Sequence, residues 1–260
     1  MQPTVIPLEI ARVRFDVASE DGALLSRLRT SYGPFVTAER GGIRVSLAGE
    51  PAALAGNPSG EVVREDEELR LRMSPQMGFL DRRRGQGTLR PHPSLLGLDM
   101  LLRAEITLRA LEAGGVALHA CGVELRGRAH VFAGPSGAGK TTLAGMLERE
   151  GARVLSDEMM VVRPGDDGRW WAYGTPYRYG TREGAPLHAL WRLRHGPRSV
   201  RALTRHQAHR HLVGNLSLCV RGDVEVELAL AGATRLAAAV DAHELTFSLT
   251  DALRDVVEAA

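Results

Sequence analysis

Short stretches in which hydrophobic and polar residues alternate with a period of two predict half-buried β-strands in the first third of the chain. The predicted strands cover residues 9–17, 43–47 and 69–73. Between the first two, Leu24, Leu25 and Leu28 share one face of a short helix that ends at Gly33-Pro34. Residues 51–60 are expected to form a loop. This pattern indicates a small mixed α/β unit over residues 1–92, with a possible role in substrate or partner recognition.

The pattern changes after Pro93, where leucine and isoleucine recur at helical spacing over residues 98–108, up to Gly114-Gly115. Two strand-like runs follow, joined by a glycine-containing turn that predicts a hairpin. The strands predicted in this part are 116–125, 129–133, 153–156, 159–162, 169–173 and 245–249, and residues 187–193 are a further apolar segment. The predicted helices are 142–150, one opened by a capping box at Thr204 and Gln207, and one from Asp251. We therefore predict a second domain over residues 93–260.

Composition adds few constraints. The chain has 260 residues, 44% of them hydrophobic, and 33 basic residues against 31 acidic ones, so no strong field selects a nucleic acid or a membrane as partner. Its two cysteines form no CxxC pair, and no apolar run is long enough to span a bilayer. We expect a cytoplasmic protein with no nucleic-acid or membrane partner. An oligomer is possible but nothing in the sequence supports one.

The most specific motif lies between the predicted strand 129–133 and the helix that follows it. It matches G-x-x-x-x-G-K-[ST], the phosphate-binding loop, in which backbone N–H groups and a helix N-terminus surround phosphate oxygens. Lys140 is the only lysine in the chain, which suggests that arginine cannot replace it. The residues expected to bind the nucleotide are Gly134, Pro135, Ser136, Gly137, Ala138, Gly139, Lys140, Thr141 and Thr142.

Asp157 and Glu158 follow directly after the predicted strand 153–156. We expect this strand to lie beside the strand that leads into the phosphate-binding loop. Its terminal carboxylates would then stand near the phosphates, where a carboxylate can hold Mg²⁺ or accept a proton from an attacking hydroxyl. Thr141, Asp157 and Glu158 are therefore the candidate magnesium ligands.

Three further groups of residues are weaker candidates. Arg178 and Arg182 lie in an irregular loop and could bind a substrate anion, or be ordinary surface arginines. The run Arg82-Arg83-Arg84 is expected to be a solvated loop rather than a docking site for an acidic partner. His206, His209 and His211 are expected to lie on a solvated helix face rather than to bind a metal.

Three motifs together resemble one family. Leu118-His119 lies upstream of the phosphate-binding loop, and Asp157-Glu158 lies one helix after it. This arrangement resembles the catalytic domain of HPr kinase/phosphorylase, whose nucleotide-binding core is similar to that of phosphoenolpyruvate carboxykinase. Glu158 stands where that family has a second aspartate, and the family's later glutamate-and-arginine signature is not found. The implied fold is α/β, a P-loop-containing mixed-sheet core of the HPr kinase / phosphoenolpyruvate carboxykinase type with a small N-terminal α/β unit.

The resemblance also implies a function. It predicts a serine kinase that uses ATP and Mg²⁺, with His119 near the transferred phosphate, Lys140 on the phosphates and Asp157 as general base. Because residues 1–92 do not match the N-terminal part of the carbon-regulation enzymes, the expected acceptor is serine of a small protein or precursor peptide rather than HPr. Two alternatives stay open: a small-molecule kinase on the same scaffold, and a nucleotide-gated binding module without phosphoryl transfer.

Overall fold

The computed structural model describes residues 2–50, 60–73, 78–92, 94–176 and 180–259. The chain divides into two compact units. Unit 1 comprises Met1–Arg109 and Leu218–Glu225, and unit 2 comprises Ala110–Ser217 and Val226–Ala260. The predicted boundary between residues 92 and 93 is not itself tested by this division and stays a prediction.

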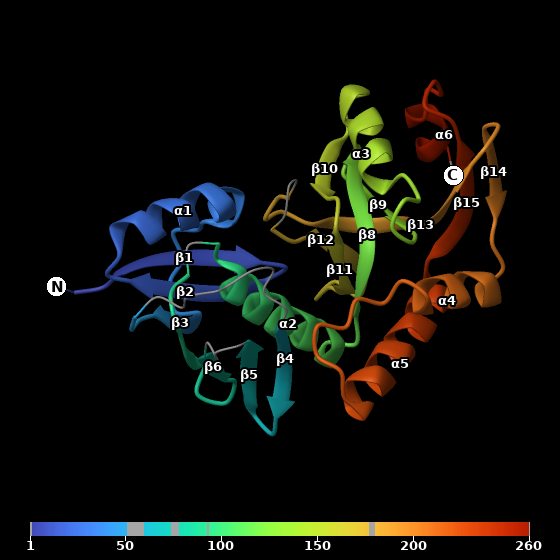
Figure 1. The fold of residues 1–260 in the computed structure, drawn as a ribbon. Helices are drawn as coiled ribbons and strands as arrows, with labels where there is room; N and C mark the ends of the chain where they lie inside the picture. The colour runs from blue at the N-terminus through green and yellow to red at the C-terminus, as the bar shows by residue number, and fades with distance from the viewer. Residues whose placement is uncertain (1, 51–59, 74–77, 93, 177–179, 260) are drawn as a thin grey trace. The chain divides into compact units, whose positions relative to one another are not determined.

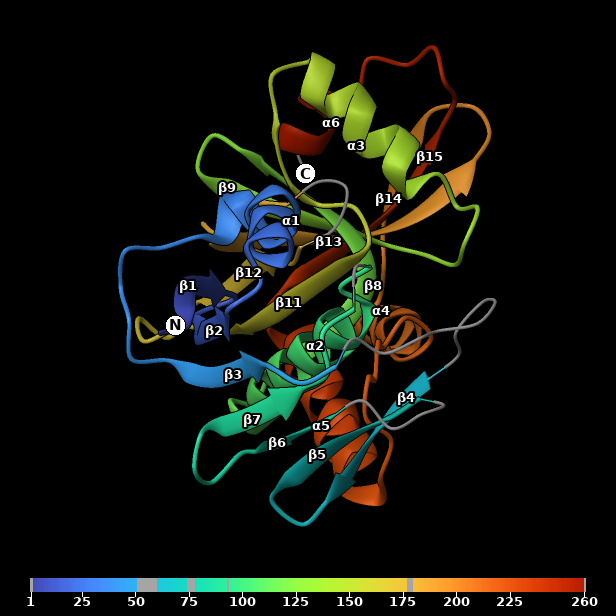
Figure 2. The same ribbon diagram turned by 60° about the vertical axis from the view of Figure 1, so that its left-hand side comes forward.

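Unit 1 is built on a seven-stranded mixed sheet in the order β1-β2-β3-β7-β6-β5-β4 (Figure 2). Its strands are β1 (Thr4–Ile10), β2 (Val13–Ser19), β3 (Ile43–Leu47), β4 (Gly60–Glu65), β5 (Glu68–Met73), β6 (Gly78–Asp81) and β7 (Gln86–Leu89). Helix α1 (Gly22–Tyr32) begins at Asp21, whose side chain accepts hydrogen bonds from the N–H groups of Ala23 and Leu24. A 3₁₀ turn, η1 (Gly33–Phe35), follows it, and α2 (Leu96–Glu112) begins in this unit.

The prediction of one strand over residues 9–17 is wrong. The chain instead forms a tight hairpin, β1 to β2, that turns at Ala11 and Arg12 with φ of 50° and 68°. A turn of this kind usually contains glycine or asparagine, and neither residue is present here. The strands β4, β6 and β7 were also not predicted, while α1, α2, β3 and β5 are confirmed. Residues 51–59 of the predicted loop lie outside the described residues.

Unit 2 contains eight strands, and the two longest are β8 (Val116–Leu125) and β13 (Ala185–His195). The others are β9 (Arg128–Ala133), β10 (Arg153–Ser156), β11 (Met159–Pro164), β12 (Trp170–Gly174), β14 (Ser199–Ala202) and β15 (Asp241–Phe247). The strands β9, β13 and β15 are parallel, and the remaining pairings are antiparallel. Starting from β8, successive pairings run through β9, β13, β12 and β11 and return to β8, so these five strands form a closed ring.

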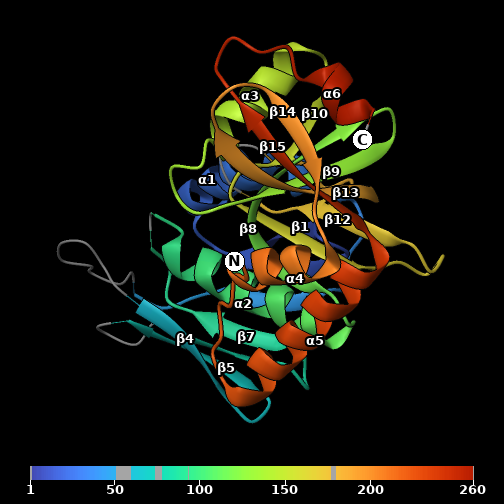
Figure 3. The same cartoon turned by 90° about the vertical axis from the view of Figure 1, so that its right-hand side faces the viewer.

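Helices cover unit 2 in two groups (Figures 1 and 3). Helices α3 (Lys140–Arg149) and α6 (Arg254–Glu258) pack on a core that includes Phe132 and Trp191. Helices α4 (Arg205–Val213) and α5 (Asp223–Ala239), the latter beginning in unit 1, contribute to a second core that includes Val131 and Leu190. Because neighbouring residues of a strand face opposite sides, Val131 and Phe132 belong to different cores. The mixed α/β architecture with two mixed sheets agrees with the predicted class.

Most elements predicted for unit 2 are confirmed, including the hairpins β8–β9 and β11–β12 and the capping box of α4. Helix α5 and strand β14 were not predicted, and the apolar segment 187–193, to which no element type was assigned, lies in strand β13. Helix α5 opens with Val224 and Val226 alternating with acidic residues, a strand-like pattern that obscures its helical period. Strand β15 ends at Phe247, so the predicted extension to Leu249 is wrong, and Leu249 is 73% exposed. No helix among the described residues is both long and apolar enough to cross a membrane.

Candidate functional site

The glycine-rich loop connects β9 to α3, as the motif predicts. Gly137 and Gly139 adopt φ of 82° and 90°, a backbone conformation that residues with a side chain rarely adopt. Gly139 is the N-cap of α3 and provides no side-chain hydrogen bond to the helix. A Cβ atom at Gly139 would also lie 3.2 Å from His195 and Phe247. The first N–H groups of α3 therefore keep their hydrogen-bonding capacity, as an anion site requires.

Lys140 is buried at the start of α3, with 7% of its surface exposed. Its ammonium donates to the backbone oxygens of Gly134 (2.7 Å) and Pro135 (3.1 Å) and contacts Nε2 of His119 at 2.9 Å. Burial lowers the pKa of Lys140, and the negative forms of Cys121 and Glu158 oppose that shift. Since an ammonium can only donate, Nε2 of His119 must accept, so Nδ1 carries the proton.

The other ring nitrogen of His119, Nδ1, lies near a carboxylate. Nδ1 lies 3.8 Å from Oε1 of Glu158, and both side chains are about one-third exposed. Strand pairing produces this proximity, because His119 of β8 is paired with Met159 of β11, the residue after Glu158. The backbone of His119 is also held in place, because its backbone N–H donates to the backbone oxygen of Asn215 at 2.8 Å. His119 and Glu158, which have 38 residues between them in the sequence, thus lie close together beside Lys140.

Asp157, the first residue of the predicted carboxylate pair, lies next to the loop. Its Oδ2 lies 3.4 Å from the hydroxyl of Thr141, while Oδ1 is buried without a hydrogen-bond partner. The residue as a whole is 4% exposed. An unsatisfied buried carboxylate oxygen is costly, so such a group typically has a functional partner. Thr141 and Asp157 are therefore positioned to share a ligand.

The expected position of the strand before Asp157 is wrong. We expected β10 beside the loop strand β9, but β10 pairs with β8, which lies between them. The carboxylate still reaches Thr141, because α3 begins at the end of β9 and Thr141 Oγ1 comes within 3.4 Å of Asp157 Oδ2. The order of the strands in the sequence does not show that β8, the other strand of the hairpin, lies between β9 and β10.

The remaining predicted residues differ in their exposure. Gly134 is buried, whereas Pro135, Ser136 and Gly137 are exposed at the tip of the loop, and Thr142 is exposed on α3. Arg178 lies outside the described residues. Arg182 is described and lies 3.4 Å from Glu183, within its own loop. Its role in substrate binding stays a prediction.

The other weak candidates lie outside this site. Within the arginine run of unit 1, Arg82 is buried and pairs with Glu105 at 2.6 Å, so the expectation of a fully solvated loop is wrong. Among the histidines of α4, His206 is exposed, His209 contacts the hydroxyl of Thr234, and Nδ1 of His211 lies 3.4 Å from Asn215.

Three residues near the loop were missed by the sequence analysis. His195, at the end of β13, places Nε2 3.3 Å from the oxygen of Gly137. Asn215 holds the backbone of His119 as described above. Cys121 is fully buried, and burial raises the pKa of its thiol to about 12, with Lys140 opposing and Asp157 adding to the shift. None of the three belongs to a local motif, because only strand pairing and helix packing bring them to the loop.

Comparisons with known proteins give little further information. No family model matches the chain, and no curated protein matches its sequence. Among solved structures, the chain is similar to the Hpr(Ser) kinase/phosphatase from Coxiella burnetii, with 10% sequence identity and a TM-score of 0.31. The match covers 55% of this chain and 91% of that one. The chain is thus a distant structural neighbour of that enzyme, and this likeness does not establish a family.

Proposed function

We propose that this protein is an ATP- and Mg²⁺-dependent phosphotransferase that phosphorylates a hydroxyl group, with serine of a small protein or precursor peptide as the acceptor. One observation carries the proposal. The hydroxyl of Thr141 lies 3.4 Å from the carboxylate of Asp157, next to the lysine of a glycine-rich loop at a helix N-terminus. Phosphoryl transfer needs this combination, since it depends on alignment, charge neutralisation and a positioned base.

The residues of the site fit a nucleotide and a divalent cation. The left-handed glycines free the loop's backbone for phosphate oxygens, and Lys140 adds a positive charge. A hydroxyl and a carboxylate are hard oxygen donors of the kind Mg²⁺ prefers, and the unpartnered Oδ1 of Asp157 is available to a further partner. Residues 134–142 would hold the nucleotide, and Thr141, Asp157 and Glu158 the cation. When bound, ATP would supply the phosphoryl group and Mg²⁺ would neutralise its charge.

The chain's own residues would perform the remaining steps. Lys140 would orient the terminal phosphate after exchanging its bonds to Gly134 and Pro135 for phosphate oxygens. Asp157 would hold the acceptor hydroxyl and take its proton, which leaves the serine oxygen able to attack. His119, in contact with Lys140, would limit where that ammonium can move. We also propose the HPr kinase type of core for residues 93–260, from the motif resemblance, and a cytoplasmic location, from the cysteine usage of the sequence.

The test replaces Asp157 by asparagine, which keeps its size and removes its basicity. Binding of a fluorescent ATP analogue with Mg²⁺ should persist, while transfer from ATP to a pool of serine peptides, measured by mass spectrometry, should fall about 10²–10⁴-fold. Asp166→Asn, at an exposed position in the β11–β12 turn, is the matched control and should behave as the wild type.

Three outcomes would contradict parts of the proposal. Unchanged transfer by Asp157→Asn would exclude Asp157 as the base. Products that appear in a metabolite pool but not in the peptide pool would identify a small-molecule kinase. Nucleotide binding without a phosphorylated product from either pool would leave a nucleotide-gated binding module.

A further inference from the structure

Strand β4 forms one edge of the sheet of unit 1. It pairs antiparallel with β5, from Gly60 opposite Met73 to Glu65 opposite Glu68, and no other described strand pairs with it. In an antiparallel pair, alternate residues turn their N–H and C=O groups away from the partner strand. An edge that no described strand covers is a template for pairing with another chain.

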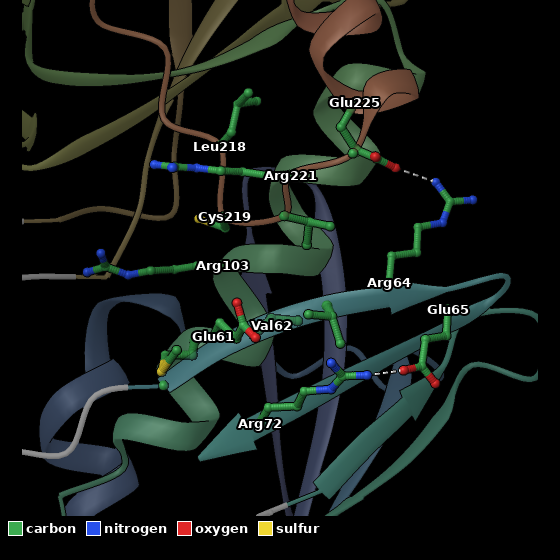
Figure 4. A pocket seen from close by; sticks show the side chains of 15 residues that line it. Glu61, Val62, Arg64, Glu65, Arg72, Arg103, Leu218, Cys219, Arg221 and Glu225 are labelled. Carbon is green, nitrogen blue, oxygen red and sulfur yellow. Dashed lines mark hydrogen bonds and ion pairs between the residues drawn. The ribbon is translucent and has the colours of Figure 1, made fainter. Parts of the chain in front are cut away.

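A cavity of about 720 Å³ lies along this strand and belongs entirely to unit 1 (Figure 4). All six residues of β4 line it, and residues 218–222 line it as well. Figure 4 shows Leu218, Cys219 and Arg221 on one side of the cavity and β4 on the other, with Arg103 of α2 between them. The apolar part of the lining consists of Val62, Val63, Met100, Leu218 and Val220. Every residue of β4 therefore borders a preformed space.

The charges around this cavity are unevenly compensated. Four arginines and three glutamates line it. Arg64 pairs with Glu225 at 2.9 Å, and Arg72 pairs with Glu65. Arg221 is exposed and forms no ion pair with any residue in the described part of the chain. The lining residues thus carry one net positive charge, four arginines against three glutamates, and Glu61 also forms no ion pair with a described residue.

We propose that this cavity binds an extended acidic peptide segment, which adds a strand beside β4. The open backbone groups of β4 would supply main-chain hydrogen bonds, the mode by which peptides add to sheet edges. The alternation of side chains along a strand would place apolar groups against the apolar lining, and carboxylates within reach of Arg221. This site uses no residue of the loop around Lys140, so it goes beyond the proposed phosphotransfer.

The probe is an acetylated and amidated peptide of alternating valine and glutamate, as long as β4 (6 residues), with a fluorescent label. Its binding to the full chain is followed by fluorescence anisotropy, without nucleotide. Amide hydrogen exchange, resolved by residue with NMR, should show new protection at every second residue of β4. Affinity should fall as salt rises, because part of it is electrostatic.

Two matched comparisons test the recognition chemistry. A peptide in which proline replaces valine at alternate positions keeps the charge but loses N–H donors, and it should not bind. Arg221→Glu should weaken binding of the valine–glutamate peptide about three- to tenfold, a charge reversal at an exposed site. Arg83→Glu, an exposed arginine in the β6–β7 turn, makes the same charge change and should leave the affinity unaltered.

The proposal is overturned if the probe does not bind, or if it binds without alternating protection in β4. It is also overturned if the proline peptide binds equally well, because main-chain pairing would then not be involved. A fourth contrary result is a dimer whose β4 amides are already protected without the probe, which would assign the edge to a second copy of the chain. Loss of ATP binding or transfer bears on none of these measurements.

Discussion

Each unit contains a buried cation, and the two are held in different ways. Arg82 of unit 1 has a side chain that is 5% exposed, and its Nε lies 2.6 Å from the fully buried carboxylate of Glu105. Lys140 of unit 2 is equally buried, but it binds two backbone oxygens and a histidine nitrogen. Within the described residues, Lys140 forms no ion pair.

This difference separates a cation held by a carboxylate from one held by backbone oxygens and a histidine nitrogen. The charge of Arg82 is compensated at contact distance by Glu105, a carboxylate that Arg109 shares. The charge of Lys140 is surrounded by dipoles rather than by a carboxylate in contact, and its field stays available to a phosphate. Burial alone would not distinguish the two positions, whereas the identity of the acceptor groups does.

The largest effect should come from changing Lys140. Lys140→Met removes the charge, and Lys140→Arg keeps it but replaces a compact ammonium by a larger planar group. We expect each to reduce phosphoryl transfer at least about 100-fold in the peptide-pool assay, because each disturbs charge placement at the phosphates. The midpoint of urea unfolding should change little, since Lys140 forms no ion pair with a described residue. Full activity of Lys140→Arg would refute the inference that arginine cannot replace the only lysine of the chain.

The next largest effect should arise in unit 1. Glu105→Gln preserves shape but leaves the buried Arg82 without its counter-charge, which should lower the free energy of unfolding by about 3–5 kcal/mol. Urea unfolding followed by circular dichroism measures the change. Arg109→Gln is the control, because Arg109 pairs with the same carboxylate from a side chain that is 42% exposed and should contribute less than about 1 kcal/mol. Equal losses in both variants would show that burial of Arg82 is not the decisive factor.

A smaller effect should depend on pH. Burial would raise the pKa of Glu244 in unit 2, but hydrogen bonds from Arg194, Arg201 and Arg192 outweigh burial and lower it to about 2. A pKa depressed by folding stabilises the protein above the unfolded value of about 4.3, and that contribution disappears as the pH falls towards 2. Glu244→Gln should therefore lower the free energy of unfolding by on the order of 1–3 kcal/mol at pH 6.

The difference between wild type and Glu244→Gln should shrink between pH 4 and pH 2, in urea unfolding measured at each pH. A difference that is constant over this range would mean that ionisation of Glu244 does not stabilise unit 2.

Local sequence was sufficient where structure is made by neighbours in the chain. The loop at residues 134–141, the hairpin β8–β9 and the cap of α4 follow from glycine, turn and capping chemistry within a few residues, and all three have the predicted local form. The β1–β2 turn was missed because Ala11 and Arg12 adopt left-handed φ without a residue type that signals it. The start of α5 was missed because its alternating pattern is that of a strand.

Where residues distant in sequence meet, the sequence was not sufficient. Placement of β8 between β9 and β10 depends on the pairing of whole strands, whose free energy is distributed over many residues. The contact of His119 with Lys140, the burial of Arg82 against Glu105, and a cavity that joins β4 to residues 218–222 have the same origin. No periodicity or spacing within one segment encodes them.

By itself, the sequence determined the chemistry offered at the candidate site: one lysine, a glycine-rich loop before a helix, and two adjacent carboxylates. Backbone conformation and side-chain type are local properties, so a short motif can specify them. Only the tertiary structure decided which groups share that site and, among the described residues, which buried cation lacks a carboxylate in contact and which edge strand has one partner only. Those outcomes depend on long-range packing, where strand order and burial set the distance and dielectric between charges.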